Sequence, residues 1–443
     1  GFADTEDLRI FKDSADVAHV FFRNGVVRIT ADNIEIIPRD NIAEEGAVWE
    51  SRILRHDIKL TDKDDGAFSK FFNKAMQRQK TVASTDLDDW RDNYHLDEDA
   101  KLQLESLRTS YGYMLHSNNN SSDAKLIFYI DENSTVGSEE GGNGKSLIMD
   151  SVKHFKKKAH IDGKKWQGGG SGSRFQFSNV ELDTQFIFID DITSSFDFTS
   201  LFSMVTGDME IEGKGTNKFV IPAKRKAKMG ITTNYVVVGS SASHKRRLHV
   251  VEFGSYWNQV TKQKERTTDE KHLGQALFEW KESHEEWVHF YNFGFRCIQQ
   301  YLRDGLTVTS QESYSNKAII REIEGSDGDG QGSEWLVDWV KSARLIKGRY
   351  TQDNSITENF LWALFKEDNA EVNPQFDFQY SKTQPVSISK EKYMEYGKLV
   401  KNLIENLPLD KFVFSRIKKV EFDSSKTSKF FDLLCNAYPN AFV

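Results

Sequence analysis

The chain has 443 residues, a formal net charge of −8 and only two cysteines. Its length allows about two or three domains with sizeable cores, and no apolar run approaches the roughly 20 residues needed to cross a bilayer, which predicts a protein without a membrane span. Cys297 and Cys435 lie far apart and lack a neighbouring Cys or His pair, which argues against a disulfide framework or a zinc site and favours a reducing compartment.

The first residues bear on the cellular location of the protein, and the charge balance bears on its binding partners. Residues 1–11 contain three acids and no continuous apolar core, which is not typical of a signal peptide. We therefore expect a cytoplasmic protein. The acidic balance excludes a surface that is basic all over, but it allows a local positive channel for nucleic acid.

Residues 1–124 are predicted to form a β-hairpin module and a helical collar. An Asn24-Gly25 turn between β-rich runs predicts a small meander over 20–38. Two apolar stripes at helical spacing then predict two helices, the first with Phe68, Phe71, Phe72 and Ala75 and the second with Leu104, Leu107, Tyr111 and Leu115.

Residues 125–324 alternate predicted strands with predicted helices, which is typical of an α/β fold with a nucleotide-binding parallel sheet. Strands are expected at 126–130, 185–189, 228–232 and 248–253. Helices are expected at 145–158 and 198–205, with an aromatic-rich helical extension at 269–306. A glycine-rich linker over 325–333 leads to a small α/β C-terminal module at 334–443, for which a winged-helix-like contact with DNA or a partner is one interpretation.

A glycine-rich loop after the first of these strands is the most informative stretch. It contains Gly141, Gly142, Asn143, Gly144, Lys145, Ser146 and Leu147. A strand that ends in such a loop and continues into a helix presents backbone N–H groups to phosphates, while a lysine and a hydroxyl complete a site for ATP and Mg²⁺. Lys145 is expected to meet the β and γ phosphates, and Ser146 to bind the metal. The usual pattern has glycine where this chain has Glu139, so an ordinary glycine turn is the alternative.

Paired carboxylates end a second apolar strand. Asp190 and Asp191 follow the run 186–189. Buried strands rarely end in two acids unless a cation or water occupies the strand tip. After a phosphate loop, Asp190 is expected to hold Mg²⁺ through water, and Asp191 to polarise the attacking water. A solvated turn is the alternative.

Two more polar elements complete the candidate catalytic set. Asn234 follows the strand at 228–232, where an amide can orient water against the γ phosphate, or can simply cap the turn. Arg246 and Arg247 precede the strand at 248–253. A guanidinium is what one subunit offers to its neighbour's γ phosphate, and solvated surface charge is the alternative.

This ordered set, Gly-Gly-Asn-Gly-Lys-Ser, Ile-Asp-Asp, Thr-Thr-Asn and Arg-Arg, resembles that of superfamily 3 helicases. Within that superfamily it resembles the helicase part of the poxvirus-type primase-helicases of phages and mobile elements. The resemblance covers about 125–306 and implies an AAA+-like P-loop NTPase core that assembles as a hexameric ring. It also implies translocation on single-stranded DNA, unwinding of forked DNA during replication in a bacterial host, and a primase or polymerase as a further partner.

A hairpin is predicted between the second and third motifs. The runs 209–212 and 218–221 alternate around 213–217, which places Lys214 near a tip. By the resemblance, Lys214 is the first candidate to grip a DNA phosphate in the ring's channel and Lys218 the second, whereas incidental lysines on an exposed hairpin are the alternative. Two basic clusters are secondary candidates to extend a positive surface, one with Lys153, Lys156, Lys157 and Lys158 and the other with Lys224, Arg225, Lys226 and Lys228.

Other classes of protein stay open at this point. A replication initiator or loading ATPase can use the same motifs without processive unwinding, and RNA helicases of the same superfamily share them. A phage packaging motor also has a phosphate loop and an acidic strand end. A non-enzymatic scaffold is disfavoured, because four nucleotide-handling elements in the expected order would then have no role.

Overall fold

The computed structural model describes residues 10–80, 90–132, 141–166, 175–193, 196, 198–212, 218–235, 246–262 and 277–309. These residues all belong to one unit of the chain. The expected linker at 325–333 and the C-terminal module at 334–443 lie outside them.

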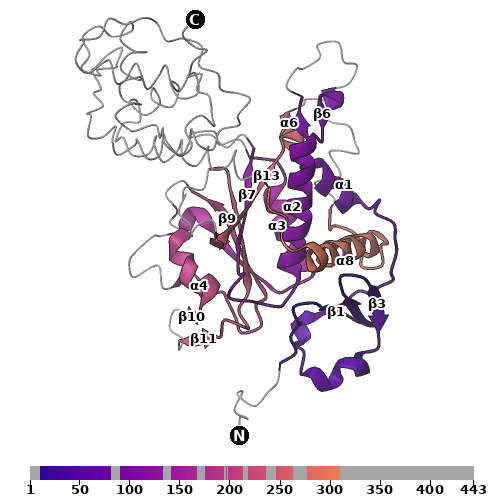
Figure 1. Cartoon of the computed structure of the whole chain (residues 1–443), viewed down its shortest axis with the longest axis vertical. Helices are drawn as coiled ribbons and strands as arrows, with labels where there is room; N and C mark the ends of the chain where they lie inside the picture. The colour runs from indigo at the N-terminus through magenta and orange to yellow at the C-terminus, as the bar shows by residue number, and fades with distance from the viewer. Residues whose placement is uncertain are drawn as a thin grey trace, which may run out of the picture. The chain divides into compact units, whose positions relative to one another are not determined.

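A five-stranded parallel sheet occupies the centre of this unit (Figure 1), in the order β13-β7-β12-β9-β8. The strands are β7 (Leu126–Asp131), β8 (Lys158–Asp162), β9 (Phe186–Ile192), β12 (Lys228–Thr233) and β13 (Leu248–Phe253). Every residue of β7, β12 and β13 is buried, as in parallel sheets that are covered on both faces. The α/β prediction and its four strands are confirmed.

The edge strand β8 replaces the end of the helix expected at 145–158, so that prediction is wrong at its C-terminal end. The helix α3 (Lys145–Ser151) passes into the 3-10 turn η4 (Val152–His154), and the chain then enters β8. Only Ala159 and Ile161 of β8 are buried. Because an edge strand needs so few apolar residues, a lysine-rich sequence forms it without a visible apolar run.

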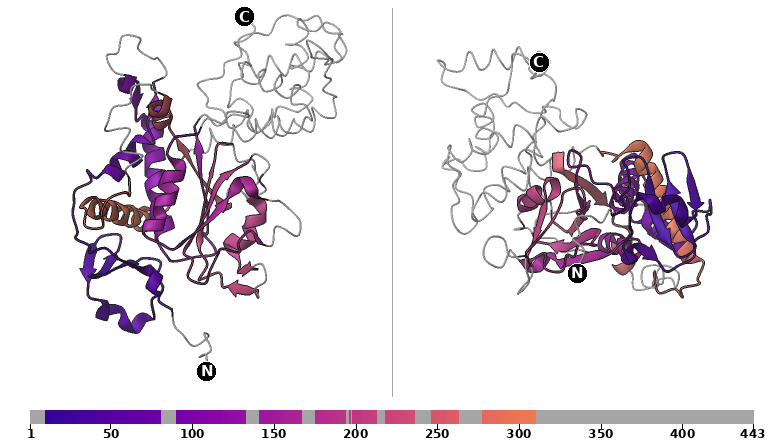
Figure 2. Two further views of the ribbon diagram at one scale, coloured as in Figure 1. Left: turned by 180° about the vertical axis from the view of Figure 1, so that it is seen from behind. Right: turned by 90° about the horizontal axis from the view of Figure 1, so that it is seen from below.

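Helices cover the sheet (Figures 1 and 2). On one face α3 packs against β9 and β12, and α2 (Glu98–Leu115) packs against β12 and β13. The helix α8 (Glu286–Asp304) packs against α2, while η7 (Phe198–Leu201) and α4 (Phe202–Thr206) lie on the opposite side of the sheet. Turns occupy 277–285, so the helical prediction over 269–306 is wrong there. No helix in the described ranges is both long and apolar enough to cross a membrane.

The N-terminal segment forms a separate small sheet in the order β3-β2-β1-β4. Its strands are β1 (Ala18–Phe22), β2 (Gly25–Ile29), β3 (Ile34–Ile37) and β4 (Ile53–Leu54). This confirms the meander but shifts its turn to Arg23–Asn24, because Phe22 pairs with Gly25. The Asn24 side chain instead bonds the Ile58 backbone, accepting from its N–H at 2.9 Å and donating to its carbonyl at 3.0 Å.

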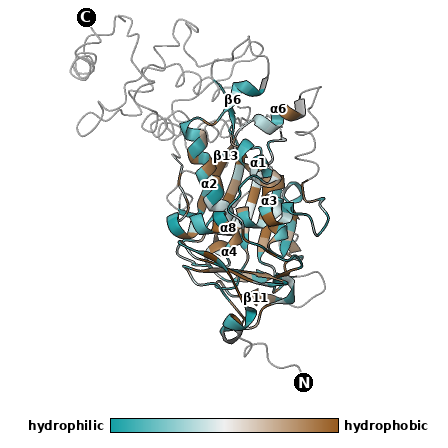
Figure 3. Ribbon diagram, turned by 90° about the vertical axis from the view of Figure 1, so that its right-hand side faces the viewer, coloured by the Kyte–Doolittle hydropathy of each residue, from teal (hydrophilic) through white to brown (hydrophobic). Residues whose placement is uncertain are grey.

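One hydrophobic core joins this N-terminal sheet to the central sheet. Phe22 meets Tyr291 of α8 edge to face, with ring centroids 4.9 Å apart. The same core takes in Phe72 of α1 (Ala67–Lys74) and Tyr111 of α2. The buried cluster therefore contains residues from both sides of residue 124, the expected end of the N-terminal region. Figure 3 shows hydrophobic residues in the strands and in the helices around them.

The remaining elements are short. They are η1 (Arg39–Glu45), η2 (Glu50–Arg52), β5 (Arg78–Gln79), η3 (Trp90–Asn93), β6 (Tyr94–His95), η5 (Gly163–Lys165), β10 (Met209–Ile211), β11 (Phe219–Ile221) and α6 (Tyr256–Lys262). The antiparallel pair β10-β11 confirms the two strands of the predicted hairpin. Its expected tip with Lys214 lies outside the described residues.

The contact between α2 and α8 generates a stability prediction. A side chain at Gly112 would overlap the backbone carbonyl of Cys297, so Gly112→Ala is expected to lower the free energy of unfolding by about 1–3 kcal/mol. At an unobstructed helix position the same change stabilises by about 0.5–1 kcal/mol, so the sign is informative. Chemical denaturation measures it, with Lys101→Ala on the exposed side of α2 as the control. Equal or higher stability of Gly112→Ala would contradict this packing.

Candidate functional site

The strand order brings polar side chains to one edge of the sheet. β12 lies between β7 and β9, and all three run in the same direction. Asp131 ends β7, Asn234 follows the last residue of β12, and Asp190 lies near the end of β9. The carboxyl ends of parallel strands are where α/β proteins bind ligands, so these residues define a candidate site.

The glycine-rich loop lies at this edge and requires its glycines. Gly142 and Gly144 have φ values of 104° and 90°, a region that favours glycine. A Cβ at Gly144 would also lie 2.8 Å from Cζ of Phe71. Phe71 of α1 stacks on Trp257 of α6 with ring centroids 4.5 Å apart, and Trp257 Nε1 donates to the Phe71 carbonyl at 3.0 Å. The loop therefore rests on an aromatic pair contributed by two distant segments.

Asn258 of α6 fixes the start of the loop. Its Nδ2 donates to the carbonyl of Gly141 at 2.7 Å, and its backbone N–H donates to Oδ1 of Asn143 at 3.2 Å. Asn143 is itself buried. The loop is thus hydrogen-bonded to α6 through Asn143 as well as packed against α6 through Trp257.

Lys145 is buried at the centre of the site, with an exposed fraction of 5%. Its Nζ forms an ion pair with Asp131 and donates to Oδ1 of Asn234 at 2.8 Å. Burial lowers the pKa of Lys145, and the charge and hydrogen bond of Asp131 oppose that shift. The two strand ends therefore hold the ammonium group at the mouth of the glycine loop.

Oxygen ligands gather beside Lys145. Ser146 Oγ donates to Oδ1 of Asp190 at 2.7 Å, and Thr232 Oγ1 donates to the same oxygen at 2.6 Å. Mg²⁺ prefers oxygen ligands and is usually held by one or two carboxylates together with phosphates and water. The Ser146 and Asp190 pair fits the protein's share of such a site.

Asp191 has an unusual backbone. Its φ is 56°, in the left-handed region, and its N–H donates to Thr232 Oγ1 at 3.0 Å. The pairing of β9 with β12 shifts register at this level, between Ile231 and Thr233. Its carboxylate meets Nζ of Lys164 at 2.7 Å. Left-handed non-glycine residues and strand irregularities are concentrated at functional sites, where they redirect side chains.

The structure brings nine of the predicted site residues together and separates three of them. Gly141, Gly142, Asn143, Gly144, Lys145, Ser146, Asp190, Asp191 and Asn234 share the carboxyl edge of the sheet. Leu147 packs against the hydrophobic core instead. Arg246 and Arg247 precede β13 and therefore lie at the amino edge, where Lys125 donates to the Arg246 carbonyl and the Arg247 guanidinium lies 5.1 Å from the Phe202 ring centroid.

Of the two lysines predicted on the hairpin, the structure describes only one. Lys218 is described, and its Nζ lies 3.7 Å from the carboxylates of both Glu210 and Glu212. Lys214 lies outside the part of the chain that the structure describes. Its predicted contact with DNA stays a prediction.

Three further polar residues at this site, Asp131, Asn258 and Lys164, are not among those predicted from the sequence. Asp131 ends an apolar strand just as Asp190 does, so the same signal applies to it. Asn258 and Lys164 lie in α6 and η5, far along the chain from the glycine loop, and only the folded structure brings them to the site.

Comparisons with known proteins add little to this site. Residues 136–247, which include the glycine loop and Arg247, match a family of unknown function (DUF5906). No curated protein matches. Two apo A-form structures of the NrS-1 C-terminal region are similar: one is 13% identical over 80% of this chain and 82% of that chain with a TM-score of 0.36, and the other, of residues 305–718, is 12% identical over 87% and 83% with a TM-score of 0.38.

The buried ion pair generates a test that needs no ligand. In a double-mutant cycle on Lys145→Met and Asp131→Asn, each single change leaves a buried polar group without its partner, so the double variant is expected to lose less stability than the sum of both singles. The coupling free energy is expected to be about 1–3 kcal/mol by chemical denaturation. A parallel cycle on the exposed pair Arg23 and Asp57 is expected to be additive. Additivity at Lys145 and Asp131 would exclude the described ion pair.

Proposed function

We propose that this protein is an ATP-dependent DNA helicase of superfamily 3, which assembles as a hexameric ring and unwinds duplex DNA during the replication of a phage or mobile element in a bacterial cytoplasm. One observation carries the proposal. A glycine loop, a lysine, a hydroxyl, a carboxylate and an amide from separate strands converge around Lys145 at the carboxyl edge of the sheet. This is the set of groups that nucleotide triphosphate hydrolysis with Mg²⁺ requires.

Nucleotide binding follows from the position of each group. The backbone N–H groups of the glycine loop bind phosphate oxygens, and Lys145 contributes its positive charge to them. Ser146 and Asp190 hold Mg²⁺, which when bound neutralises charge on the β and γ phosphates. Asp131 and Asn234 keep the Lys145 ammonium in place before the nucleotide arrives.

Hydrolysis uses the two remaining polar groups at this edge. Asp191 accepts a hydrogen bond from the attacking water and polarises it, and Asn234 orients the same water. Lys164 forms an ion pair with the Asp191 carboxylate at 2.7 Å and helps to hold it in place. Phosphoryl transfer depends on positioning and charge, so fixed groups at the ends of adjacent strands suit it.

Arg246 and Arg247 support assembly as a ring. They precede β13, at the edge of the sheet opposite Lys145 of the same chain. An arginine there reaches a γ phosphate only in an adjacent copy, so ATP binds at a subunit interface in this proposal. Hydrolysis then moves the β10-β11 hairpin, with Lys214 and Lys218, along one DNA strand. A primase or polymerase is the expected further partner.

The same ATP site is compatible with two alternative functions. A replication initiator or loader remodels DNA without processive unwinding, and an RNA helicase of this superfamily acts on RNA instead of DNA. A forked DNA substrate with a single-stranded tail distinguishes the first, and competition between DNA and RNA oligonucleotides distinguishes the second.

Loss of the loop lysine tests the ATP site. Lys145→Ala is expected to lower ATP turnover by about 10²–10³-fold and to abolish unwinding of forked DNA, because it removes the charge that stabilises the phosphates. A coupled ATPase assay and a strand-displacement assay measure these losses. Lys153→Ala is the matched control, because Lys153 lies just beyond α3 and its Nζ pairs with Asp150. Unwinding by Lys145→Ala at the wild-type rate would rule out this assignment.

Mixed assemblies test the shared site. An Arg246→Ala/Arg247→Ala variant and an Asp191→Asn variant are each expected to be inactive alone. Mixed together they are expected to regain part of the ATPase activity, because some interfaces then combine an intact Asp191 with an intact arginine pair. Activity is followed across mixing ratios, with each variant mixed with itself as the control. No recovery at any ratio would contradict completion of the site by a neighbouring subunit.

A further inference from the structure

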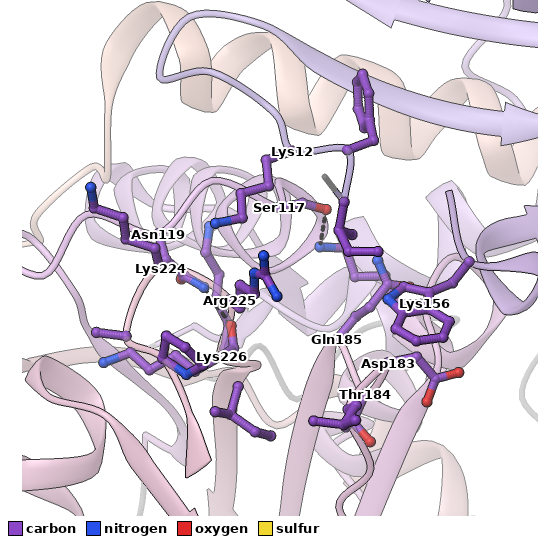
Figure 4. A pocket seen from close by; sticks show the side chains of 18 of the residues that line it. Lys12, Ser117, Asn119, Lys156, Asp183, Thr184, Gln185, Lys224, Arg225 and Lys226 are labelled. Carbon is purple, nitrogen blue, oxygen red and sulfur yellow. Dashed lines mark hydrogen bonds between the residues drawn. The ribbon is translucent and has the colours of Figure 1, made fainter. Parts of the chain in front are cut away.

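A second cavity of about 850 Å³ lies at the amino edge of the sheet, opposite the edge that holds Lys145. Lys228, the first residue of β12, and Gln185, which precedes β9, belong to its lining. Trp49 and Arg52 of the N-terminal segment, the loop after α2, and strand β11 form the other walls. Figure 4 shows part of this lining, including Ser117 from the loop after α2 and Gln185 before β9.

The lining is strongly cationic. It contains seven basic residues, namely Lys12, Arg52, Lys156, Lys224, Arg225, Lys226 and Lys228. It also contains two acids. Asp183 pairs with Lys157 at 2.6 Å, and Asp208 accepts from the N–H of Ala223 at 2.7 Å while its charge raises the pKa of Lys226 against the lowering effect of burial. Five of the basic residues come from the clusters that the sequence marks as secondary, while Lys153, Lys157 and Lys158 pair with carboxylates instead.

Three of these lysines are buried without an acidic partner. Lys156, Lys226 and Lys228 are 6%, 5% and 5% exposed. Their amines donate to neutral oxygens, namely Ser117 Oγ at 3.2 Å, the Gly207 carbonyl at 3.1 Å and the Tyr113 carbonyl at 2.7 Å. Among the described residues no carboxylate forms an ion pair with any of the three.

This arrangement is unfavourable for the free protein. Burial lowers the pKa of Lys156 to about 7 and that of Lys226 to about 8, and it lowers the pKa of Lys228 as well. The charges of Asp13 and Asp208 oppose these shifts without forming an ion pair with any of the three lysines. Buried amines without an ion-pair partner cost stability, and they persist where a ligand or a reaction uses them. An anion in the cavity supplies a closer counter-charge.

The mouth of the cavity carries three more cations. Lys12, Lys224 and Arg225 are exposed, and Figure 4 shows Lys12 and Arg225 extending toward the same space. Burial lowers the pKa of Lys12, and the charges of Arg225 and Lys224 lower it further. A phosphate between these side chains relieves their mutual repulsion.

Apolar surfaces accompany these charges. Trp49, Leu182 and Val220 line the cavity and are 38%, 57% and 51% exposed, a large fraction for such side chains. A cationic groove beside exposed aromatic and aliphatic surfaces is the pattern that binds single-stranded nucleic acid, whose phosphates meet the cations and whose bases stack. A volume of about 850 Å³ exceeds what one inorganic phosphate fills.

We propose that this cavity binds a segment of single-stranded nucleic acid, with phosphates on Lys12, Lys224 and Arg225 and with a base against Trp49. The site is separate from the ATP site, which lies at the opposite edge of the sheet. It gives the N-terminal segment a direct contact with the strand. The inference rests on the cavity alone, so the experiment is done without ATP and its failure leaves the ATP site untouched.

The test is binding of a fluorescent oligothymidylate to the full chain, measured by anisotropy at several salt concentrations. Lys224→Ala/Arg225→Ala is expected to weaken binding at least tenfold and to reduce the slope of log affinity against log salt by about 1.4, since each phosphate contact on a single strand contributes about 0.7. Trp49→Ala is expected to weaken binding by about 5- to 100-fold through lost stacking. Lys101→Ala, an exposed cation on α2, is the control and is expected to bind as the wild type.

Two results would overturn the proposal. One is unchanged binding by both cavity variants when their thermal unfolding matches that of the wild type. The other is displacement of the oligonucleotide by a nucleoside triphosphate in the Lys145→Ala background, which would assign the cavity to a free nucleotide.

A pH profile distinguishes a binding role of Lys156 from a structural one. The charged and titratable groups that face Lys156 are Arg52, Asp13, His116 and Lys228, and burial keeps the pKa of His116 at about 4, so His116 stays neutral above pH 6. Free Lys156 loses its proton above about pH 7, and a bound phosphate favours the protonated form. Affinity is therefore expected to fall as the pH rises from 7 to 9.

Lys156→Met is the matching variant. It is expected to raise the thermal unfolding temperature near pH 7, to weaken binding of the oligonucleotide, and to flatten the pH profile. A variant that is more stable and binds with the wild-type pH profile would show that Lys156 takes no part in binding and would contradict the proposed anion site.

Discussion

A buried ammonium group at the carboxyl edge of the parallel sheet is the constraint on which the candidate site depends. Lys145 is held there by Asp131 at the end of β7 and by Asn234 after β12. The glycine loop and the carboxyl ends of β7 and β12 must therefore lie close together. The order of strands, with β12 between β7 and β9, makes this possible and also brings Asp190 within reach of Ser146. The stacked rings of Phe71 and Trp257 pack against the loop at Gly144 and support it.

The carboxyl and amino edges of the sheet differ in how their buried lysines are paired. The carboxyl edge surrounds one buried lysine with carboxylates, which suits a site where a metal and a triphosphate share the charge. At the amino edge, three buried lysines form no ion pair with a described carboxylate, which suits a polyanion without a metal. Strand β12 runs from one to the other, since Lys228 begins it and Asn234 follows its end. The strand β12 thus runs between the two proposed sites.

The sequence predicted the parts of the fold in which local pattern and tertiary role agree. Apolar runs that end in acids or glycines identify β7 and β9, and the expected antiparallel strands around 213–217 are present. The edge strand β8 escaped prediction because only Ala159 and Ile161 are buried, and 277–285 forms turns despite an aromatic-rich sequence. Asp131 carried a usable signal, whereas the roles of Asn258 and Lys164 depend on contacts between distant segments. The cationic cavity could not be predicted for the same reason, because its residues come from the N-terminal segment, the turn between η4 and β8, and the approach to β12.

The most direct test of the central claim is an experimental structure of the full chain with Mg²⁺ and a non-hydrolysable ATP analogue. The account predicts a triphosphate in the loop of Gly142 and Gly144, the Lys145 amine at the β and γ phosphates, and the metal between Ser146 and Asp190. Nucleotide bound elsewhere, or an empty loop at saturating nucleotide, would contradict it.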